Sequence, residues 1–297
     1  MCVSFIMNRR DYLNRSALLA IMAGMGVDVH SSILKSKLKL KVSACDWSIG
    51  KNCDPGAFEI AKQIGLQGVQ VNLGIENNNV RLRQTSMRQT YREISKKFNI
   101  EISSLALGEL NSVPYKSDPR TETWVSDAID VAGAFDVHVI LLAFFDKNDL
   151  RNDASGKEEV IQRLKKVAPK AEKLGVTLGI ESYLSAAEHQ EIIQRVGSKS
   201  IKVYLDFRNT ADAGYDVLKE LRQLGRNAIC ELHIKENGKL LSEGTLDWHK
   251  IGETLASISY RGEENWMQIE WSLPEGMDVV KGYQHNLKYI KEAFGLN

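Results

Sequence analysis

The chain has 297 residues, of which 43% are hydrophobic and 26% charged, and this composition is ordinary for a globular protein with one large core. Its formal net charge of +1 argues against a nucleic-acid-binding protein, because that class usually carries a strongly basic surface. The four cysteines include no C-x-x-C pair, so the sequence indicates neither a zinc ribbon nor a thiol redox site.

The first predicted element is an export signal. Arg9-Arg10 precedes a short apolar run over residues 16–27, which is the layout of a secretory signal peptide. The arginines are followed by Asp-Tyr-Leu, which resembles the twin-arginine signal R-R-x-F-L-K. We therefore expect residues 1–36 to be a signal peptide and linker, and 37–297 to be a periplasmic domain with no stable membrane anchor. Without a functional leader, the protein would stay in the cytoplasm, with the segment as an amphipathic helix on the domain.

From residue 38 onward, strand patterns alternate with helical patterns. The predicted strands lie at residues 38–47, 68–72, 101–110, 137–145, 176–183, 203–206, 230–233 and 266–270. The predicted helices lie at 55–65, 85–98, 122–135, 158–175, 186–197, 217–225, 247–260 and 279–294. For the first helix, Asp54 is the expected N-cap, Pro55 the first helical residue and Gly65 the end.

This alternation predicts an α/β fold, a single-domain (β/α)8 TIM barrel. Apolar strands that are joined by helices form a parallel sheet, and eight such units are enough to close a barrel. The alternative is an open doubly wound sheet, which usually has a glycine-rich phosphate turn after its first strand. Residues 45–51 read Cys-Asp-Trp-Ser-Ile-Gly-Lys, which is not a G-x-G-x-x-G turn.

Four of the later strands each end in a potential metal ligand. These residues are Glu181, Asp206, His233 and Glu270. If the strands are parallel neighbours, the four side chains converge at the carboxyl-terminal rim of the barrel. Two Glu, one Asp and one His form a hard, oxygen-rich ligand set. This set suits Mn²⁺, Mg²⁺ or Co²⁺. It is less specific for Zn²⁺.

The same part of the chain resembles the xylose isomerase-like barrel superfamily, in its sugar isomerase and epimerase branch. The resemblance covers residues from about 38 to the end. It is carried by Tyr204-Leu-Asp206-Phe-Arg-Asn209, His233-Ile-Lys235-Glu236 and Ser242-Glu243-Gly244-Thr-Leu-Asp247-Trp248. The last two stretches are similar to H-x-K-D and G-E-G-x-[ID]-[DW]. The resemblance implies that Glu181, Asp206, His233 and Glu270 bind the metal.

Some positions depart from the family pattern. Glu236 stands where many relatives have Asp, and Ser242 replaces the first Gly of the G-E-G loop. Asn209 stands nearest to the position where ketose 3-epimerases have a further His, and Gly238-Lys239 occupies the region of a family Arg. The metal-binding residues therefore match those of the family, but the substrate-binding residues differ. The resemblance does not indicate which sugar this protein uses.

Together these features predict a divalent-metal-dependent sugar isomerase or epimerase. Proton transfer next to a carbonyl, through a metal-stabilised enediolate, would use Glu181 and Glu270 as the acid/base pair. Manganese is the first expectation for the ion, with Mg²⁺, Co²⁺ and Zn²⁺ as alternatives. The candidate substrate-binding residues are Lys235, Trp47, Asn72, Glu109, Asn209 and Glu243. Each has a structural alternative, such as a helix cap, a surface ion pair or packing at the barrel rim.

The same residues are compatible with other functions. The alternatives are a metal-dependent lyase or hydrolase that acts on an oxidised glycoside, and a non-catalytic sugar-binding barrel. An endonuclease IV-type barrel needs a histidine-rich metal cluster, whereas His233 is the one histidine predicted at the active rim. His138 is predicted at the opposite rim, and His189 on the solvent side of a helix. The expected partner is a small sugar, and a homo-oligomer remains open.

Overall fold

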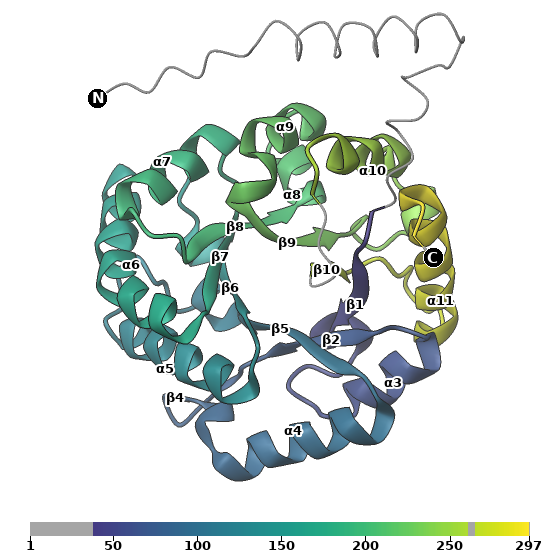
Figure 1. Cartoon of the computed structure of the whole chain (residues 1–297), viewed down its shortest axis with the longest axis horizontal. Coiled ribbons are helices and arrows are strands. Elements are labelled where there is room, and N and C mark those ends of the chain that lie inside the picture. The colour runs from purple at the N-terminus through teal and green to yellow at the C-terminus, as the bar shows by residue number, and fades with distance from the viewer. Residues whose placement is uncertain (1–37, 261–264, 297) are drawn as a thin grey trace, which may run out of the picture. The chain divides into compact units, whose positions relative to one another are not determined.

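The computed structural model describes residues 38–260 and 265–296, in which eight parallel strands close into a barrel (Figure 1). The predicted signal segment, residues 1–36, lies outside the described residues. The order of the strands around the barrel is β1-β10-β9-β8-β7-β6-β5-β2. Because every neighbouring pair is parallel, all carboxyl ends meet at one rim, and the prediction of a (β/α)8 barrel is confirmed.

The barrel strands are β1 (Lys41–Cys45), β2 (Gly68–Asn72), β5 (Glu101–Leu107), β6 (Val139–Phe144), β7 (Thr177–Ser182), β8 (Ile201–Asp206), β9 (Ile229–Ile234) and β10 (Trp266–Ile269). A short antiparallel hairpin, β3 (Ile75–Glu76) with β4 (Asn79–Val80), lies outside the barrel sheet. The strands are apolar because both of their faces are covered. The sequence of β6, for example, reads Val-Ile-Leu-Leu-Ala-Phe, and five of its six residues are buried.

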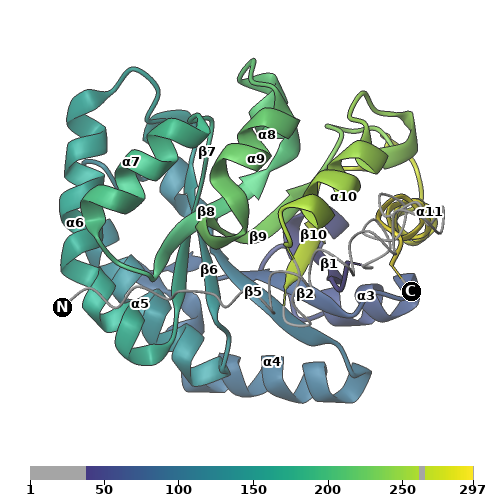
Figure 2. The same cartoon turned by 45° about the horizontal axis from the view of Figure 1, so that its top comes forward.

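Helices form the outer ring (Figures 1 and 2). They are α3 (Ala57–Ile64), α4 (Thr85–Phe98), α5 (Arg120–Phe135), α6 (Ala154–Leu174), α7 (Ala186–Val196), α8 (Phe207–Asp212), α9 (Val217–Ala228), α10 (Trp248–Ser257) and α11 (Val279–Phe294). Single 3-10 turns are η1 (Asp46–Ile49), η2 (Arg81–Arg83), η3 (Gly108–Asn111), η4 (Asp146–Asn148) and η5 (Leu241–Glu243). No helix within residues 38–260 and 265–296 has the length and apolar character of a membrane span.

Local hydrogen bonds explain where the predicted boundaries were wrong. Asp54 accepts a bond from the Gly56 backbone N–H, and α3 begins at Ala57, so Asp54 and Pro55 form a turn before the helix. Helix α6 begins earlier than the predicted residue 158, because the Asp153 carboxylate caps it by accepting from the Gly156 N–H. Helix α8, directly after β8, was not predicted.

The prediction that His189 faces solvent was also wrong. Its side chain lies on the inner side of α7 and is only 4% exposed. His189 Nδ1 lies 3.0 Å from the Ser185 carbonyl oxygen, and Nε2 lies 2.9 Å from Ser182 Oγ. Both ring nitrogens therefore have partners, and burial lowers the pKa of His189 to about 4. A histidine that stays neutral can be packed between a helix and a strand.

Candidate metal and active site

The four predicted ligands converge on one ring nitrogen of His233. Its Nδ1 lies 3.1 Å from Glu181 Oε1, 3.5 Å from Glu270 Oε2 and 3.9 Å from Asp206 Oδ2. The arrangement follows from the sheet, because Asp206 pairs directly with His233 across β8 and β9. Glu181 lies near the end of the next strand, β7, and Glu270 directly follows β10 on the other side. All four side chains are buried.

This donor set fits a divalent ion. One ligand atom from each of the four residues lies within 4.8 Å of the others. Ligands on opposite sides of an ion with bonds of ~2.0–2.3 Å lie about 4–4.6 Å apart, so the spacing is suitable. In addition, Asp206 Oδ2 is buried and accepts no hydrogen bond from the described residues, although Lys235 Nζ lies 3.0 Å away. A buried carboxylate oxygen that accepts no hydrogen bond, beside three other potential ligands, suits a metal-ligand position.

A chain of hydrogen bonds in the barrel interior orients His233. Its Nε2 lies 2.7 Å from Gln70 Oε1, so Nε2 carries the proton and Nδ1 faces the carboxylates. The Gln70 amide donates onward to the Tyr204 hydroxyl over 2.9 Å, and that hydroxyl donates to Glu231 over 2.8 Å. Gln268 also donates to Glu231 over 2.8 Å. The imidazole orientation is therefore fixed from inside the barrel.

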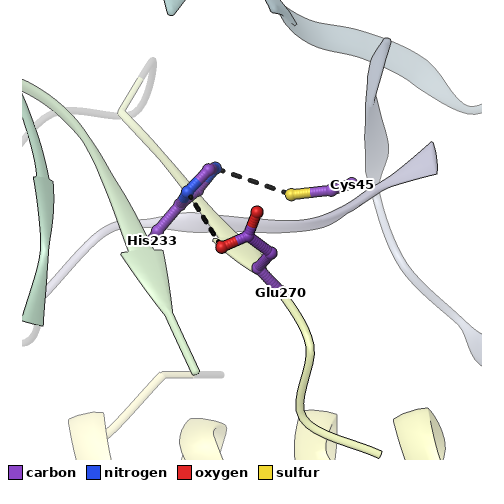
Figure 3. A group of neighbouring side chains, drawn as sticks. All are labelled: Cys45, His233 and Glu270. Atoms are coloured by element: carbon purple, nitrogen blue, oxygen red, sulfur yellow. Dashed lines mark hydrogen bonds and ion pairs between the residues drawn. The ribbon is translucent and has the colours of Figure 1, made fainter. Parts of the chain in front are cut away.

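A second group of potential ligands shares His233 and Glu270 with the first and adds Cys45, which lies at the other ring nitrogen of His233. Cys45, His233 and Glu270 also have ligand atoms within 4.8 Å of one another. Figure 3 shows that Cys45 approaches one ring nitrogen and Glu270 the other. The Cys45 thiol donates to Gln70 Oε1, and burial, with the nearby carboxylates, raises its pKa well above the ordinary value. A thiol that stays protonated is a poor ligand, so the carboxylate group is the better metal site.

Positive and negative side chains lie next to one another in the site and shift each other's pKa values. Burial lowers the pKa of His233, but Glu181, Glu270 and Asp206 outweigh it and raise the value to about 9. Lys235 Nζ lies 3.0 Å from both Asp206 Oδ2 and Glu270 Oε2. The carboxylates that favour a proton on Nδ1 also favour a metal ion there, and binding of the ion would release that proton.

The two glutamates differ in their surroundings. Burial raises the pKa of Glu181, although His233 opposes this effect. Burial also acts on Glu270, but there Lys235 and His233 outweigh it and the pKa is lowered. Glu270 accepts a further hydrogen bond of 2.8 Å from Trp47 Nε1. Two nearby carboxylates with opposite tendencies are suited to give and take protons.

A cavity of about 340 Å³ opens above these residues, at the small end of the range for ligand sites, about 300–1,000 Å³. Glu181 and Glu270 line it, whereas Asp206 and His233 lie behind them. Of the predicted substrate residues, Trp47, Asn72, Asn209 and Lys235 line the cavity.

The other two predicted substrate residues do not line this cavity. Glu109 lies behind Asn72, whose amide donates to it over 3.3 Å. Glu243, in η5, is exposed. Glu243 is thus not among the residues that line the cavity, and its predicted contact with the substrate stays a prediction.

Several cavity residues were missed by sequence reasoning. They are Asn52, Asn111, Tyr183 and Trp271, all in loops or single turns where no periodicity marks orientation. Gln70 was also missed, although it carried a signal. It is a polar residue between Val69 and Val71 in a strand whose residues are all buried, so it needed a polar partner. The contact of Cys45 with His233 was not predicted either.

Comparison with known proteins agrees with this architecture. The chain is 24% identical over 157 residues to D-psicose 3-epimerase of Enterocloster bolteae, a match that covers 48% of this chain and 52% of that protein. It is 22% identical over 197 residues to 2-epi-5-epi-valiolone 7-phosphate 2-epimerase of Actinoplanes sp., covering 66% of this chain and 72% of that protein. The match to the first thus spans about half the length of the curated relative.

Solved structures show the same fold. D-psicose 3-epimerase from Clostridium cellulolyticum H10, crystallised with D-tagatose, superposes with a TM-score of 0.70 at 18% identity, covering 86% of this chain and 99% of that one. The relatives described here are named as epimerases, and two of them are D-psicose 3-epimerases. The family described as xylose isomerase-like TIM barrel matches residues 58–293. The chain therefore belongs to the xylose isomerase-like TIM barrel family.

Proposed function

We propose that this protein is a divalent-metal-dependent sugar epimerase or isomerase that moves a proton on the carbon next to a carbonyl. One observation carries the proposal. Glu181 and Glu270 both line the cavity, and both lie beside His233 Nδ1, at 3.1 and 3.5 Å. A sugar in the cavity would have one carboxylate on each side, as removal and return of a proton require.

The neighbours of the two glutamates support this role. Trp47 Nε1 holds one oxygen of Glu270, and Lys235 Nζ holds the other at 3.0 Å. Asn209 Nδ2 donates to Glu181 over 3.2 Å, which fixes the opposite carboxylate. Glu181, Asp206, His233 and Glu270 would hold the ion, with Mn²⁺ as the first expectation. A bound divalent ion would polarise the carbonyl and favour loss of the neighbouring proton.

The cavity favours an uncharged sugar. Among the described residues that line it, Lys235 is the one cation, and it is already paired with Asp206 and Glu270. Its polar wall consists largely of the neutral amides of Asn52, Asn72 and Asn111. Amides donate to and accept from hydroxyl groups, whereas a phosphate group would need free positive charge. We therefore propose an unphosphorylated substrate.

The proposal is tested by deuterium incorporation. D-Fructose, D-psicose and D-tagatose are incubated with the Mn²⁺-loaded protein in D2O, and carbon-bound deuterium is measured by NMR. We expect exchange with at least one of them, and a loss of at least about 100-fold in both E181Q and E270Q. The matched control is E59Q, because Glu59 is an exposed glutamate on α3. Exchange at the wild-type rate in E270Q would contradict the acid/base role.

Metal binding is tested separately. Mass spectrometry of the purified protein should find about one equivalent of a divalent metal, which a D206A/H233A double variant loses. Binding of a sugar without exchange, in a metal-loaded protein, would instead favour a non-catalytic sugar-binding barrel.

A further inference from the structure

A second cavity lies beside the first and shares one residue with it. This second cavity, of about 470 Å³, is called here the outer groove. Trp271 lines both cavities and directly follows Glu270. The outer groove is lined by Ser48, Asn237, Gly238, Trp271, Leu273, Pro274, Glu275, Gly276 and Met277. A ligand that reacts at Glu270 therefore passes Trp271 on its way into the groove.

Trp271 is held in an unusual position. Its backbone has a φ of 44°, in the left-handed region that bulky residues rarely adopt. The Trp271 carbonyl accepts a hydrogen bond of 2.7 Å from the Gly238 N–H, which ties this turn to the loop after β9. The side chain is nevertheless 50% exposed, so packing does not account for the strained conformation. Such strain is typical of residues that are held in place for a ligand.

The outer groove combines apolar and polar surfaces. Trp271, Leu273 and Met277 supply its apolar side, and Met277 is 39% exposed. Asn237 and Glu275 supply polar groups, and among the described residues lining the groove none is a cation. A sugar ring has the matching character, because its C–H face packs on an indole while its hydroxyl groups bind amides and carboxylates. The chemistry fits a neutral polyol and disfavours a phosphate or another anion.

The groove is also open to a second ring. A Cβ placed on Gly238 or Gly276 would meet no atom within 4 Å, so these backbones leave free space. A single sugar ring fits in the inner cavity of about 340 Å³ and leaves the outer groove uncovered. A ligand with two connected rings would contact Trp271, which lines both cavities.

We propose that the substrate is a glycoside rather than a free monosaccharide: the ring that reacts at Glu181 and Glu270 carries a second uncharged sugar ring, which packs on Trp271 in the outer groove. This assignment rests on the proposed function, because it takes the inner cavity as the place of reaction. It adds the class of substrate, which the metal ligands do not define.

The test compares one-ring and two-ring ligands that share the reacting part. Maltulose and palatinose each carry glucose on D-fructose and keep the fructose carbonyl free. Their dissociation constants and that of D-fructose are measured by calorimetry on the Mn²⁺-loaded protein. We expect at least one disaccharide to bind about tenfold more tightly than D-fructose, and W271A to reduce this ratio to about one. L174A is the control, because Leu174 is an exposed apolar residue on α6 outside both cavities, and it should keep the ratio.

Several results would overturn the glycoside assignment. One is that no disaccharide binds more tightly than D-fructose. Another is that W271A weakens the binding of D-fructose and of the disaccharides by the same factor. A dimer in solution that W271A dissociates would also overturn it, by making the groove a contact between two copies. Deuterium exchange on the same ligands separates the two proposals. A preference for disaccharides without exchange refutes the proposed function alone, whereas exchange without a preference refutes the glycoside assignment alone.

Discussion

His189 should make the stability of the barrel depend on pH in a way that a single substitution removes. Its ring is buried between α7 and β7, with Ser185 and Ser182 as partners. Burial lowers its pKa from 6.5 to about 4, although the Ser185 carbonyl and Glu188 act in the opposite direction. In the unfolded chain the imidazole is in water and takes up its proton near pH 6.5.

The sign and size follow from proton linkage. Below pH 6.5 the unfolded state binds a proton that the folded state does not accept until about pH 4, so the free energy of unfolding falls as the pH falls through this window. At ~1.4 kcal/mol for each pH unit, His189 accounts for about 2 kcal/mol lost by pH 5 and about 3 kcal/mol by pH 4. Above pH 6.5 its contribution is fully present.

The assay is urea unfolding of wild type and H189Q between pH 7.5 and 4. We expect H189Q to lose about 2 kcal/mol less than wild type between pH 7.5 and 5, whatever its stability at pH 7.5. The same substitution at His249, an exposed position on α10, should run parallel to wild type. Parallel curves for H189Q and wild type would refute the reasoning, since they would mean that the buried ring accepts a proton as readily as the unfolded chain does.

Three further predictions concern other parts of the molecule. Q70A should weaken Mn²⁺ binding by about 10–100-fold in competition with a chelator, because Gln70 orients His233, and unchanged affinity would exclude that role. E236Q should lower the free energy of unfolding, measured by urea unfolding, by about 2 kcal/mol. The reason is that the Glu236 carboxylate accepts hydrogen bonds from two backbone N–H groups and from Trp248 Nε1. A loss below about 0.5 kcal/mol would contradict this. Replacing Arg9-Arg10 by two lysines should keep the protein in the cytoplasm on cell fractionation, and undiminished periplasmic protein would refute the predicted leader.

The part of the site that the sequence predicts is the part built on regular strands. Glu181, Asp206, His233 and Glu270 each follow or end an apolar run, and parallel strands bring their ends to one rim whatever the loops do. Gln70 belongs to the same regular structure, but its role depends on which residues face it across the closed barrel. Gln70 lies close to His233 only because the sheet closes into a barrel, and no local sequence pattern indicates this contact.

Most residues that line the cavity from loops cannot be predicted from strand patterns. Asn111 and Trp271 lie in a single turn and a loop, where the direction of a side chain depends on unusual backbone angles such as the positive φ of Trp271. Glu243 was proposed from a motif match, and in the structure it is exposed and does not line the cavity. His189 shows that a helical pattern alone does not identify the buried face when a polar residue has partners in the core.

The proposed metal ligands lie at the ends of the contiguous strands β7, β8, β9 and β10, whereas Asn52 and Asn111 follow β1 and β5 and Asn72 ends β2, on the other half of the barrel. In the proposed function, the first half would hold the ion, and the three asparagines on the other half line the cavity for the sugar. Substitutions among the asparagines can change which sugar is accepted without disturbing the ion, and their effects should add to those of changes on the metal side. For directed evolution, these three asparagines are the positions to randomise, whereas Gln70 and Trp47 on the same half would be kept because they contact His233 and Glu270.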